Sequence, residues 1–316
     1  MALSATGAFT PLRQAFAQSG WPDKPIRIIN PYAPGGIADL AARIIQPGLQ
    51  SALGQPIIVE SRPGASGSFG TELVARSAPD GYTLLLALAA PQTLNQFILK
   101  VNYDGLRDFA PIALLNTNPL VLMTNPALPV RTVSELIAYG KANPGKLNFS
   151  GAGGFTSFAG EIFKHMAGID MVHVPYRGGA PAVTAAAAGD VQLTFANFSD
   201  ALTWMRSGRL RAIAITSARR FPQAPDVPTI AEAGLPGFEV TGWSGLLAPA
   251  GTPPAIINRL AGILQKDLAE PAMRKRWEDI GAEPGHADPA AFAAMIRSDM
   301  QKWSDFVKRT GIKLES

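Results

Sequence analysis

The sequence predicts an α/β protein whose two lobes are joined by a hinge and enclose a ligand between them. Short apolar strands alternate with helical segments in both halves of the 316-residue chain, a pattern typical of sheets covered by helices. A glycine-rich turn joins a strand to a helix once in each half. The chain then ends in helical segments alone, which need a sheet to cover. We therefore expect the end of the chain to return to the first lobe.

The first lobe begins as a βαβαβ unit. We expect strands at residues 26–29, 57–59 and 82–88, with helices at residues 40–53 and 69–78 between them. Crossovers of this kind are right-handed and place the strands parallel in one sheet. Residues 112–123 add short apolar runs at the end of this half.

A second α/β unit follows a capping box, in which the Thr132 side chain accepts a hydrogen bond from the backbone of Glu135 at a helix start. Gly168 fits the left-handed conformation that ends a helix. The expected strands cover residues 147–150, 171–174, 191–195 and 211–216, and the expected helices cover residues 158–167, 180–188 and 200–207.

The rest of the chain is expected to be an extended segment at residues 239–249 and three helices at residues 254–268, 271–280 and 289–310. Asp288 is the predicted N-cap of the last helix. No strand is expected after residue 249.

These elements define the predicted domains. Domain 1 is discontinuous and covers residues 21–123 and 242–316, whereas domain 2 covers residues 124–241. Residues 1–20 are expected to be a residual export signal or a flexible tail, because Ala15-Phe16-Ala17 resembles a signal-peptidase site.

The two glycine-rich junctions carry the main functional signal. They cover residues 30–39 and residues 149–157. A helix start carries backbone N–H groups without intrahelical partners and about half a positive charge, and glycine lets that backbone approach a ligand closely. One such turn in each lobe predicts a small anion held between the lobes.

Composition excludes several classes of protein. With 47% hydrophobic and 16% charged residues, the chain is not a disordered protein. The net charge of +4 is dispersed, and the densest run, at residues 274–276, is interpreted as a solvated helix face rather than a nucleic-acid site. The longest apolar run, at residues 84–91, is too short to span a membrane. The absence of cysteine removes disulfides and thiolate chemistry.

Signals for catalysis or for a cofactor are weak. Residues 64–68 resemble a nucleophile elbow, but the last glycine is replaced by serine and no suitably placed histidine follows. Residues 151–156 begin like a dinucleotide fingerprint but lack its last glycine. His165, His173 and His286 have no partner at metal-ligand spacing. We therefore expect no metal, no cofactor and no catalytic residue.

Motifs in both halves resemble those of one family. The first half contains Trp21-Pro22-Asp23-Lys24-Pro25, Pro34-Gly35-Gly36 with Asp39 and Arg43, Arg62-Pro63-Gly64-Ala65 and Ala78-Pro79-Asp80-Gly81-Tyr82. The second half contains Asn143-Pro144-Gly145-Lys146-Leu147, His173-Val174-Pro175-Tyr176-Arg177-Gly178-Gly179, Pro225-Asp226-Val227-Pro228-Thr229 and Ala248-Pro249-Ala250-Gly251-Thr252-Pro253. From residue 21 to residue 313 the chain resembles the Bug, or tripartite tricarboxylate transporter receptor (TctC-like), family.

The resemblance implies a two-lobed periplasmic binding protein-like fold of type II, with a ligand cleft between the lobes and no catalysis. It implies a monomeric periplasmic solute-binding protein, a small organic carboxylate as ligand, and the permease subunits of a tripartite tricarboxylate transporter as partners. A carboxylate sensor that docks on a signalling receptor would use the same site with a different partner. An acyl- or phosphoryl-transfer enzyme is a remote alternative, because it would need a base near Ser66 that the sequence does not show.

Carried over position by position, the resemblance implies ligand contacts in both lobes. Each position lies at or just beyond the carboxyl end of a predicted strand, where ligands bind in open α/β sheets. The first-lobe contacts are Ala33, Gly35, Gly36, Asp39, Ala65, Ser66, Ala90 and Gln92, and the second-lobe contacts are Ser150, Gly153, Thr156, Ser157, Tyr176 and Asn197.

Several of these residues have a structural alternative. Asp39, Thr156 and Ser157 could instead cap a helix, and Tyr176 and Asn197 could be core or turn residues.

Phe155 stands where the family commonly has a smaller residue. With Phe158 and Phe195 it could form an aromatic wall, which favours an aromatic or bulky carboxylate over citrate or an amino acid. Phenylalanines at this spacing also serve the core, so that alternative stays open.

Overall fold

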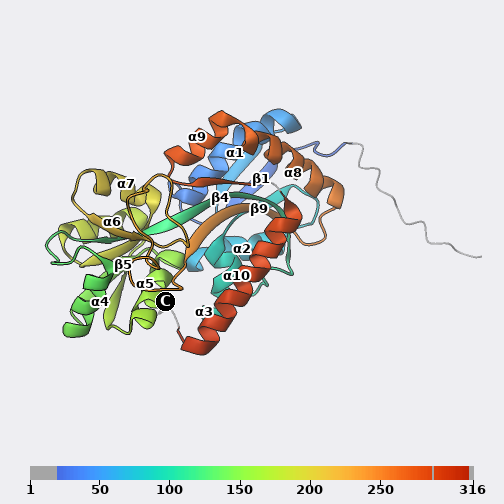
Figure 1. The fold of residues 1–316 in the computed structure, drawn as a ribbon. Coiled ribbons are helices and arrows are strands. Elements are labelled where there is room, and N and C mark those ends of the chain that lie inside the picture. Colours follow the sequence, from blue (N-terminus) through green and yellow to red (C-terminus); the bar gives the residue numbers. More distant parts are fainter. Residues whose placement is uncertain (1–19, 287, 313–316) are drawn as a thin grey trace, which may run out of the picture.

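Ten strands form one curled sheet in the computed structural model, which describes residues 20–286 and 288–312. The strand order is β2-β1-β3-β9-β4-β7-β5-β6, and β8 and β10 pair with β4 beside this path. Helices cover both faces of the sheet (Figure 1). The predicted α/β class is confirmed. Apart from Gly20, the predicted export signal lies outside the described residues.

The first half of the chain forms the βαβαβ unit that its sequence predicts. The strands β1, β2 and β3 are parallel, with β1 in the centre. Short helical turns, η1, η2 and α3, follow β2 and β3. The bounds are β1 Ile26–Asn30, α1 Ile37–Leu53, β2 Ile57–Ser61, η1 Ala65–Gly67, α2 Ser68–Ala75, β3 Thr83–Leu88, η2 Ala90–Leu94 and α3 Asn95–Ile98.

The middle of the chain repeats this plan. The strands β6, β5 and β7 are parallel neighbours. The predicted capping box is present, because Thr132 Oγ1 accepts the backbone N–H of Glu135 at 3.1 Å. The bounds are α4 Val133–Ala142, β5 Leu147–Gly151, α5 Gly154–Ala167, β6 Met171–Pro175, α6 Gly179–Ala188, β7 Leu193–Asn197, α7 Phe198–Arg206 and β8 Arg211–Ile215.

One long strand joins the two halves. β4 runs from Phe109 to Thr124, longer than the apolar runs from which it was expected. Its residues 109–119 pair antiparallel with β9 (Thr241–Pro249), and its residues 120–124 pair with β7 and β8. Figure 1 shows β4 passing from one half of the molecule to the other. The two halves are therefore joined by paired strands.

The helical end of the chain returns to the first half, as its sequence predicts. The helices α8 (Pro254–Ala269) and α9 (Pro271–Asp279) share a hydrophobic core with α1 on one face of the sheet. On the other face, the core includes side chains from α2 and from α10 (Pro289–Thr310). Asp288 caps α10 by accepting the backbone N–H groups of Ala290 and Ala291.

The expectation that no strand follows residue 249 is wrong. Residues Glu283–His286 form β10, which pairs antiparallel with β4. This segment lacks the apolar alternation of a strand, and its extended conformation depends on pairing with the neighbouring strand β4 instead. A Cβ on Gly285 would lie 2.4 Å from the carbonyl oxygen of Leu114, so glycine permits the close approach to β4.

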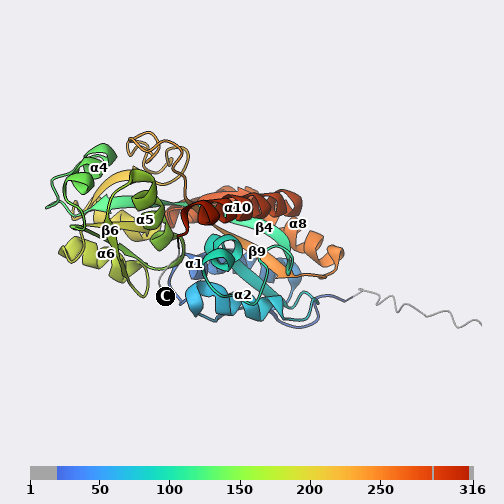
Figure 2. The same ribbon diagram turned by 90° about the horizontal axis from the view of Figure 1, so that it is seen from below.

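Aromatic side chains on α10 connect it to the other half. The ring of Trp303 lies 5.3 Å from that of Phe155 and 5.5 Å from that of Phe158, both on α5. Phe306 also packs edge-on against Phe158. Figure 2 shows the end of α10 reaching toward α5. One core cluster therefore extends across both halves, and the domain boundaries given above stay a prediction.

Within the described residues, the helices are too short or too polar for any of them to span a lipid bilayer.

The contact between α5 and β5 gives a test of the packing. A Cβ on Gly160 of α5 would lie 2.0 Å from Cε2 of Phe149, whereas one on Gly262 of α8 would meet nothing within 4 Å. We expect Gly160→Ala to lower the free energy of unfolding by about 1–3 kcal/mol through overpacking. The matched change Gly262→Ala should raise it by about 0.5–1 kcal/mol, because alanine favours the helix. Urea unfolding measures both, and equal stability of the two variants would contradict this packing.

Candidate ligand-binding site

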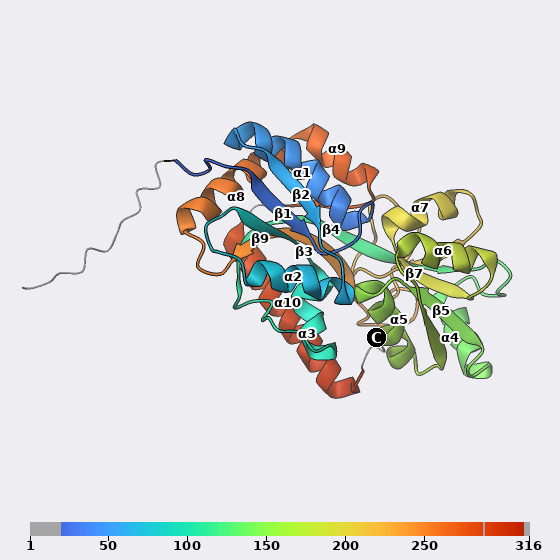
Figure 3. The ribbon, with the colours of Figure 1, turned by 180° about the vertical axis from the view of Figure 1, so that it is seen from behind.

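The two predicted junctions line one hollow of about 390 Å³ between the halves of the molecule. The turn between β1 and α1 lines it from one side, and the turn between β5 and α5 lines it from the other. Figure 3 shows α1 and α2 in one half and α5, α6 and α7 in the other. The hollow is therefore a cleft between two lobes.

The first turn is held by its own side chains. Asp39 Oδ2 accepts the backbone N–H of Gly35 at 3.1 Å and the Nε–H of Arg43 at 3.0 Å. Gly35 has φ +87°, a conformation that favours glycine. Asp39 is buried and does not line the hollow. Its carboxylate fixes the shape of the turn that precedes α1.

The second turn is held by two hydroxyl groups. Thr156 Oγ1 accepts the N–H of Ala152 at 2.8 Å and donates to the carbonyl of Gly153 at 2.8 Å. Ser157 Oγ accepts the N–H of Gly153 at 3.0 Å. Gly153 and Gly154 have φ values of +81° and +53°, which a side chain would strain. The hydroxyl groups therefore support the turn in which these glycines lie.

The turns face each other closely. A Cβ on Gly154 would lie 3.3 Å from Cβ of Ala90 and 3.5 Å from the hydroxyl of Tyr32, both in the other lobe. A Cβ on Gly153 would lie 3.5 Å from Oγ of Ser66. Tyr32 is fixed in turn, because its hydroxyl donates to the carbonyl of Ser66 at 2.8 Å. The lobes thus approach within contact distance beside the hollow.

Four helices begin at this hollow without a side-chain cap. They are α1, α5, α6 and α7, and residues from the first turn or N-cap of each line the cavity. Away from the hollow, α4 and α10 are capped by Thr132 and Asp288, whereas α2, α8 and α9 have no side-chain cap. Uncapped helix starts present N–H donors and a partial positive charge. The hollow is therefore suited to an anion.

The structure places half of the predicted contact residues on the wall of this hollow and half outside its lining. Gln92 and Ser150 are buried, with their side chains bonded to the carbonyls of Gly105 and Ala182. Ligand contact stays a prediction for the whole set. The hollow is lined by Ala33, Gly35, Gly36, Ala90, Gly153, Thr156 and Asn197, but not by Asp39, Ala65, Ser66, Gln92, Ser150, Ser157 or Tyr176.

Several lining residues were not singled out from the sequence. One signal was available, since Gly178-Gly179 is a third glycine turn between a strand, β6, and a helix, α6. The others are brought to the hollow by distant chain segments, which local patterns do not reveal. They are Asn118, Asp200 and Trp243, whereas Tyr32 lies within the first predicted junction and Arg177 directly precedes the third glycine turn.

A polar chain crosses the wall of the hollow from the joining strand to α7. Asn118 Nδ2 of β4 donates to Oδ1 of Asn197 at 3.3 Å, and Asn197 Nδ2 donates to Oδ2 of Asp200 at 3.2 Å. Burial raises the pKa of the Asp200 carboxyl, and the bond from Asn197 opposes that rise.

The three phenylalanines do not form one wall of the hollow. Phe155 lines it, but Phe158 and Phe195 lie in the core. Phe195 packs edge-on against Phe149 at 6.1 Å, and Phe158 packs against α10. The i, i+3 spacing of Phe155 and Phe158 on α5 therefore serves the core at both positions, and Phe155 also lines the hollow.

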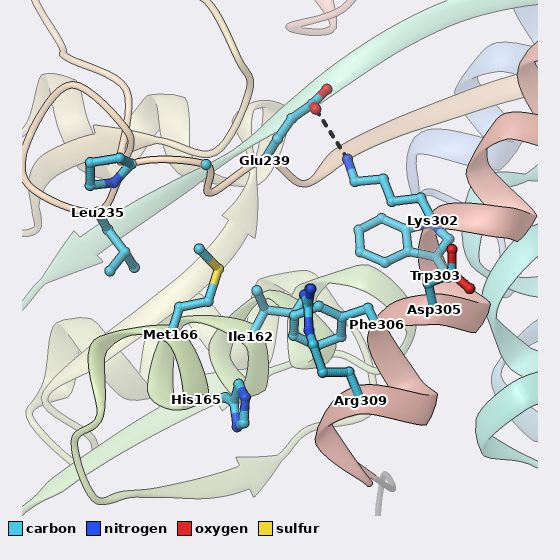
Figure 4. A pocket seen from close by; sticks show the side chains of 12 residues that line it. Ile162, His165, Met166, Leu235, Glu239, Lys302, Trp303, Asp305, Phe306 and Arg309 are labelled. Atoms are coloured by element: carbon cyan, nitrogen blue, oxygen red, sulfur yellow. Dashed lines mark hydrogen bonds and ion pairs between the residues drawn. The ribbon is translucent and has the colours of Figure 1, made fainter.

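A second hollow, of about 610 Å³, lies between α5 and α10 and has a different character (Figure 4). Its lining includes Ile162, His165 and Met166 from the second half of α5, and Trp303 and Phe306 from the second half of α10. The C-terminal end of a helix carries a partial negative charge. Lys302 and Arg309 also line this second hollow, but it lacks the helix starts that line the cleft, so the expected anion site stays in the cleft.

The described residues hold no group of three or more His, Asp or Glu side chains that could bind a metal ion. His173 packs against the ring of Phe149 at 4.9 Å, and burial lowers its pKa. A structural role accounts for this histidine.

Several known proteins are similar to this chain in sequence and in fold. The model of the tripartite tricarboxylate transporter family receptor matches residues 41–312. Protein BugT of Bordetella pertussis is 38% identical over 299 residues, which cover 93% of this chain and 92% of that protein.

Two solved structures with bound ligands superimpose on nearly the whole chain. Rpa4515 of R. palustris with adipate has a TM-score of 0.86 and 32% identity, and the match covers 93% of this chain and 99% of that chain. MatC (Rpa3494) from Rhodopseudomonas palustris with bound malate has a TM-score of 0.83 and 32% identity, over 91% and 100%.

The predicted two-lobed periplasmic binding protein fold is confirmed by the structure of the periplasmic binding protein BugD, which has a TM-score of 0.81 and 32% identity over 93% of this chain and 100% of that chain. The predicted resemblance is confirmed by the family match and by BugT. The chain belongs to the tripartite tricarboxylate transporter receptor family, a family of substrate-binding receptors rather than enzymes.

Proposed function

We propose that this chain is a periplasmic solute-binding protein that captures a small organic carboxylate between its lobes for uptake by a tripartite tricarboxylate-type transporter. The observation that carries this proposal is the pair of uncapped helix starts, those of α1 and α5, on opposite sides of one cleft. A carboxylate has two oxygens, and each can accept N–H groups from one lobe.

Binding of this kind couples capture to closure of the cleft. A ligand that bonds to both lobes is bound more tightly when the lobes are close, so it shifts the protein toward the closed form. The paired strands β4 and β9, which join the lobes, are the natural hinge. The closed form would then be recognised by the membrane permease subunits.

The relatives support this reading of the cleft. Adipate and malate, the ligands in the two solved structures, are both carboxylates. The family description names a transporter, which supports a permease as partner and the periplasm as location. A monomer suffices for this mechanism, because one chain supplies both sides of the cleft.

The central experiment is a thermal-shift screen over aliphatic and aromatic carboxylates, followed by calorimetry on those that bind. A ligand at about 100 times its Kd should raise the free energy of unfolding by about 2.7 kcal/mol. Matched amides or alcohols that lack the carboxylate should leave the melting temperature unchanged. Equal shifts from the neutral analogues would contradict carboxylate capture.

Gly36 tests the first turn. Its φ of −83° is open to any residue, and a Cβ there would meet only the carbonyl of Ala33 at 4.0 Å. We expect Gly36→Val to fold normally but to lose nearly all carboxylate binding, because the methyl groups keep a ligand from the backbone. Gly262→Val makes the same change on α8, far from the cleft, and should bind as the parent does. Parental affinity in Gly36→Val would rule out close approach at this turn.

Thr156 tests the second turn. Thr156→Val keeps the shape of the side chain but removes the hydroxyl that bonds to Ala152 and Gly153. We expect carboxylate binding to weaken by on the order of 1 kcal/mol, because the turn loses its support. Thr156→Ser keeps the hydroxyl and should retain the affinity. If calorimetry finds the two variants alike, the hydroxyl has no part in binding.

A further inference from the structure

Asp200 places a negative charge in a cleft that otherwise suits an anion. It is the third residue of α7 and lines the hollow together with Asn197, the N-cap of the same helix. The sequence pattern gave no reason to place it there, because the helix start reaches the cleft only through the pairing of β7 with β4 and β5. A carboxylate-binding site with a carboxylate in its own wall needs an explanation.

The Asp200 carboxylate has a fixed position beside the start of α6. Its Oδ2 accepts the Nδ2–H of Asn197 at 3.2 Å, and Asn197 is held by Asn118 at 3.3 Å. A Cβ on Gly179, the first residue of α6, would lie 2.1 Å from the same Oδ2. The carboxylate therefore packs directly against Gly179, and only glycine leaves room for it.

This position puts a carboxylate among the cleft-lining residues at two of the four helix starts, those of α6 and α7. A third start, that of α1, has Asp39 in its first turn, but this carboxylate does not line the hollow and is paired with Arg43. The α6 helix has no side-chain cap, and Asp200 lies beside its first residue and within the first turn of α7. A negative charge is stabilised at a helix start. The start of α1, in the other lobe, and the start of α5, in the same lobe as α6 and α7, have no carboxylate among the lining residues.

The cleft is therefore electrostatically divided. At the α1 and α5 end, N–H groups are available to a ligand carboxylate. At the α6 and α7 end, a second ligand carboxylate would meet a like charge, whereas a hydroxyl or an ammonium group would find a hydrogen-bond acceptor.

We propose that Asp200 determines specificity by selecting a ligand with one carboxylate and, at its other end, a hydrogen-bond donor such as a hydroxyl group. The inference rests on the proposed capture of a carboxylate at α1 and α5. It assigns to Asp200 the role of accepting a hydrogen bond from the ligand and of rejecting a second anion.

Arg177 is the one positively charged side chain among the described residues that line the hollow. It precedes the N-cap of α6, lines the hollow and is exposed. An exposed guanidinium is screened by solvent and attracts anions of many kinds to the entrance. Asp200 is more buried, so its charge acts on the ligand with less screening.

The test is calorimetry on three matched pairs that differ only in the distal group. The pairs are 4-hydroxybutanoate with succinate, 6-hydroxyhexanoate with adipate, and 4-hydroxybenzoate with terephthalate. For the pair that fits the cleft, we expect the hydroxy member to bind about tenfold more tightly or better. Asp200→Asn keeps the shape but removes the charge, and should lower that preference by about tenfold.

Two further variants serve as a control for the charge change and as an alternative substitution at Asp200. Asp190→Asn makes the same charge change at an exposed position outside the cleft and should leave the preference unchanged. Asp200→Ser provides a second, smaller replacement if Asp200→Asn does not fold. A preference for the dicarboxylate, or an unchanged preference in the Asp200 variants, would overturn the role of Asp200 while leaving carboxylate capture intact. Binding of none of the six compounds would contradict the proposed function itself, and this inference with it.

Discussion

Backbone N–H groups at helix starts are the feature on which this site depends. An α-helix leaves its first N–H groups without intrahelical partners, and most helices satisfy them with side chains or water. This protein caps α4 and α10 with Thr132 and Asp288. It leaves α1 and α5 uncapped at the cleft. The nearby side chains of Asp39 and Thr156 bond to the turns before these helices instead. In the proposed function, the ligand carboxylate would accept the N–H groups that the chain leaves open.

Two connections keep these starts opposite each other. The strand β4 belongs to both parts of the sheet, and β9 runs beside its first half. On the far side, Trp303 and Phe306 of α10 pack against α5, whose first residues line the cleft. A movement of the lobes must therefore rearrange the contact between α5 and α10. This arrangement ties the cleft to a continuous core, which favours a few defined positions of the lobes over free motion.

The sequence predicts the local structure well and the long-range structure only in part. The strand-helix alternation, the cap at Thr132 and the return of the helical end follow from periodicity and capping rules. The strand β10 was missed because Gly285 and its neighbours adopt it only through pairing with β4. Both glycine-rich turns that are proposed to bind an anion are visible in the sequence. Asn118, Asp200 and Trp243 are not, since distant segments bring them to the cleft.

The most direct test is to follow backbone amide chemical shifts by NMR during titration with a carboxylate that binds. Hydrogen bonds to a carboxylate should shift the amide signals at the starts of both α1 and α5, for example those of Ile37 and Phe155. The amides at the start of α4, which Thr132 caps, should stay unchanged. Shifts confined to one lobe, or centred on the hollow between α5 and α10, would contradict capture between facing helix starts.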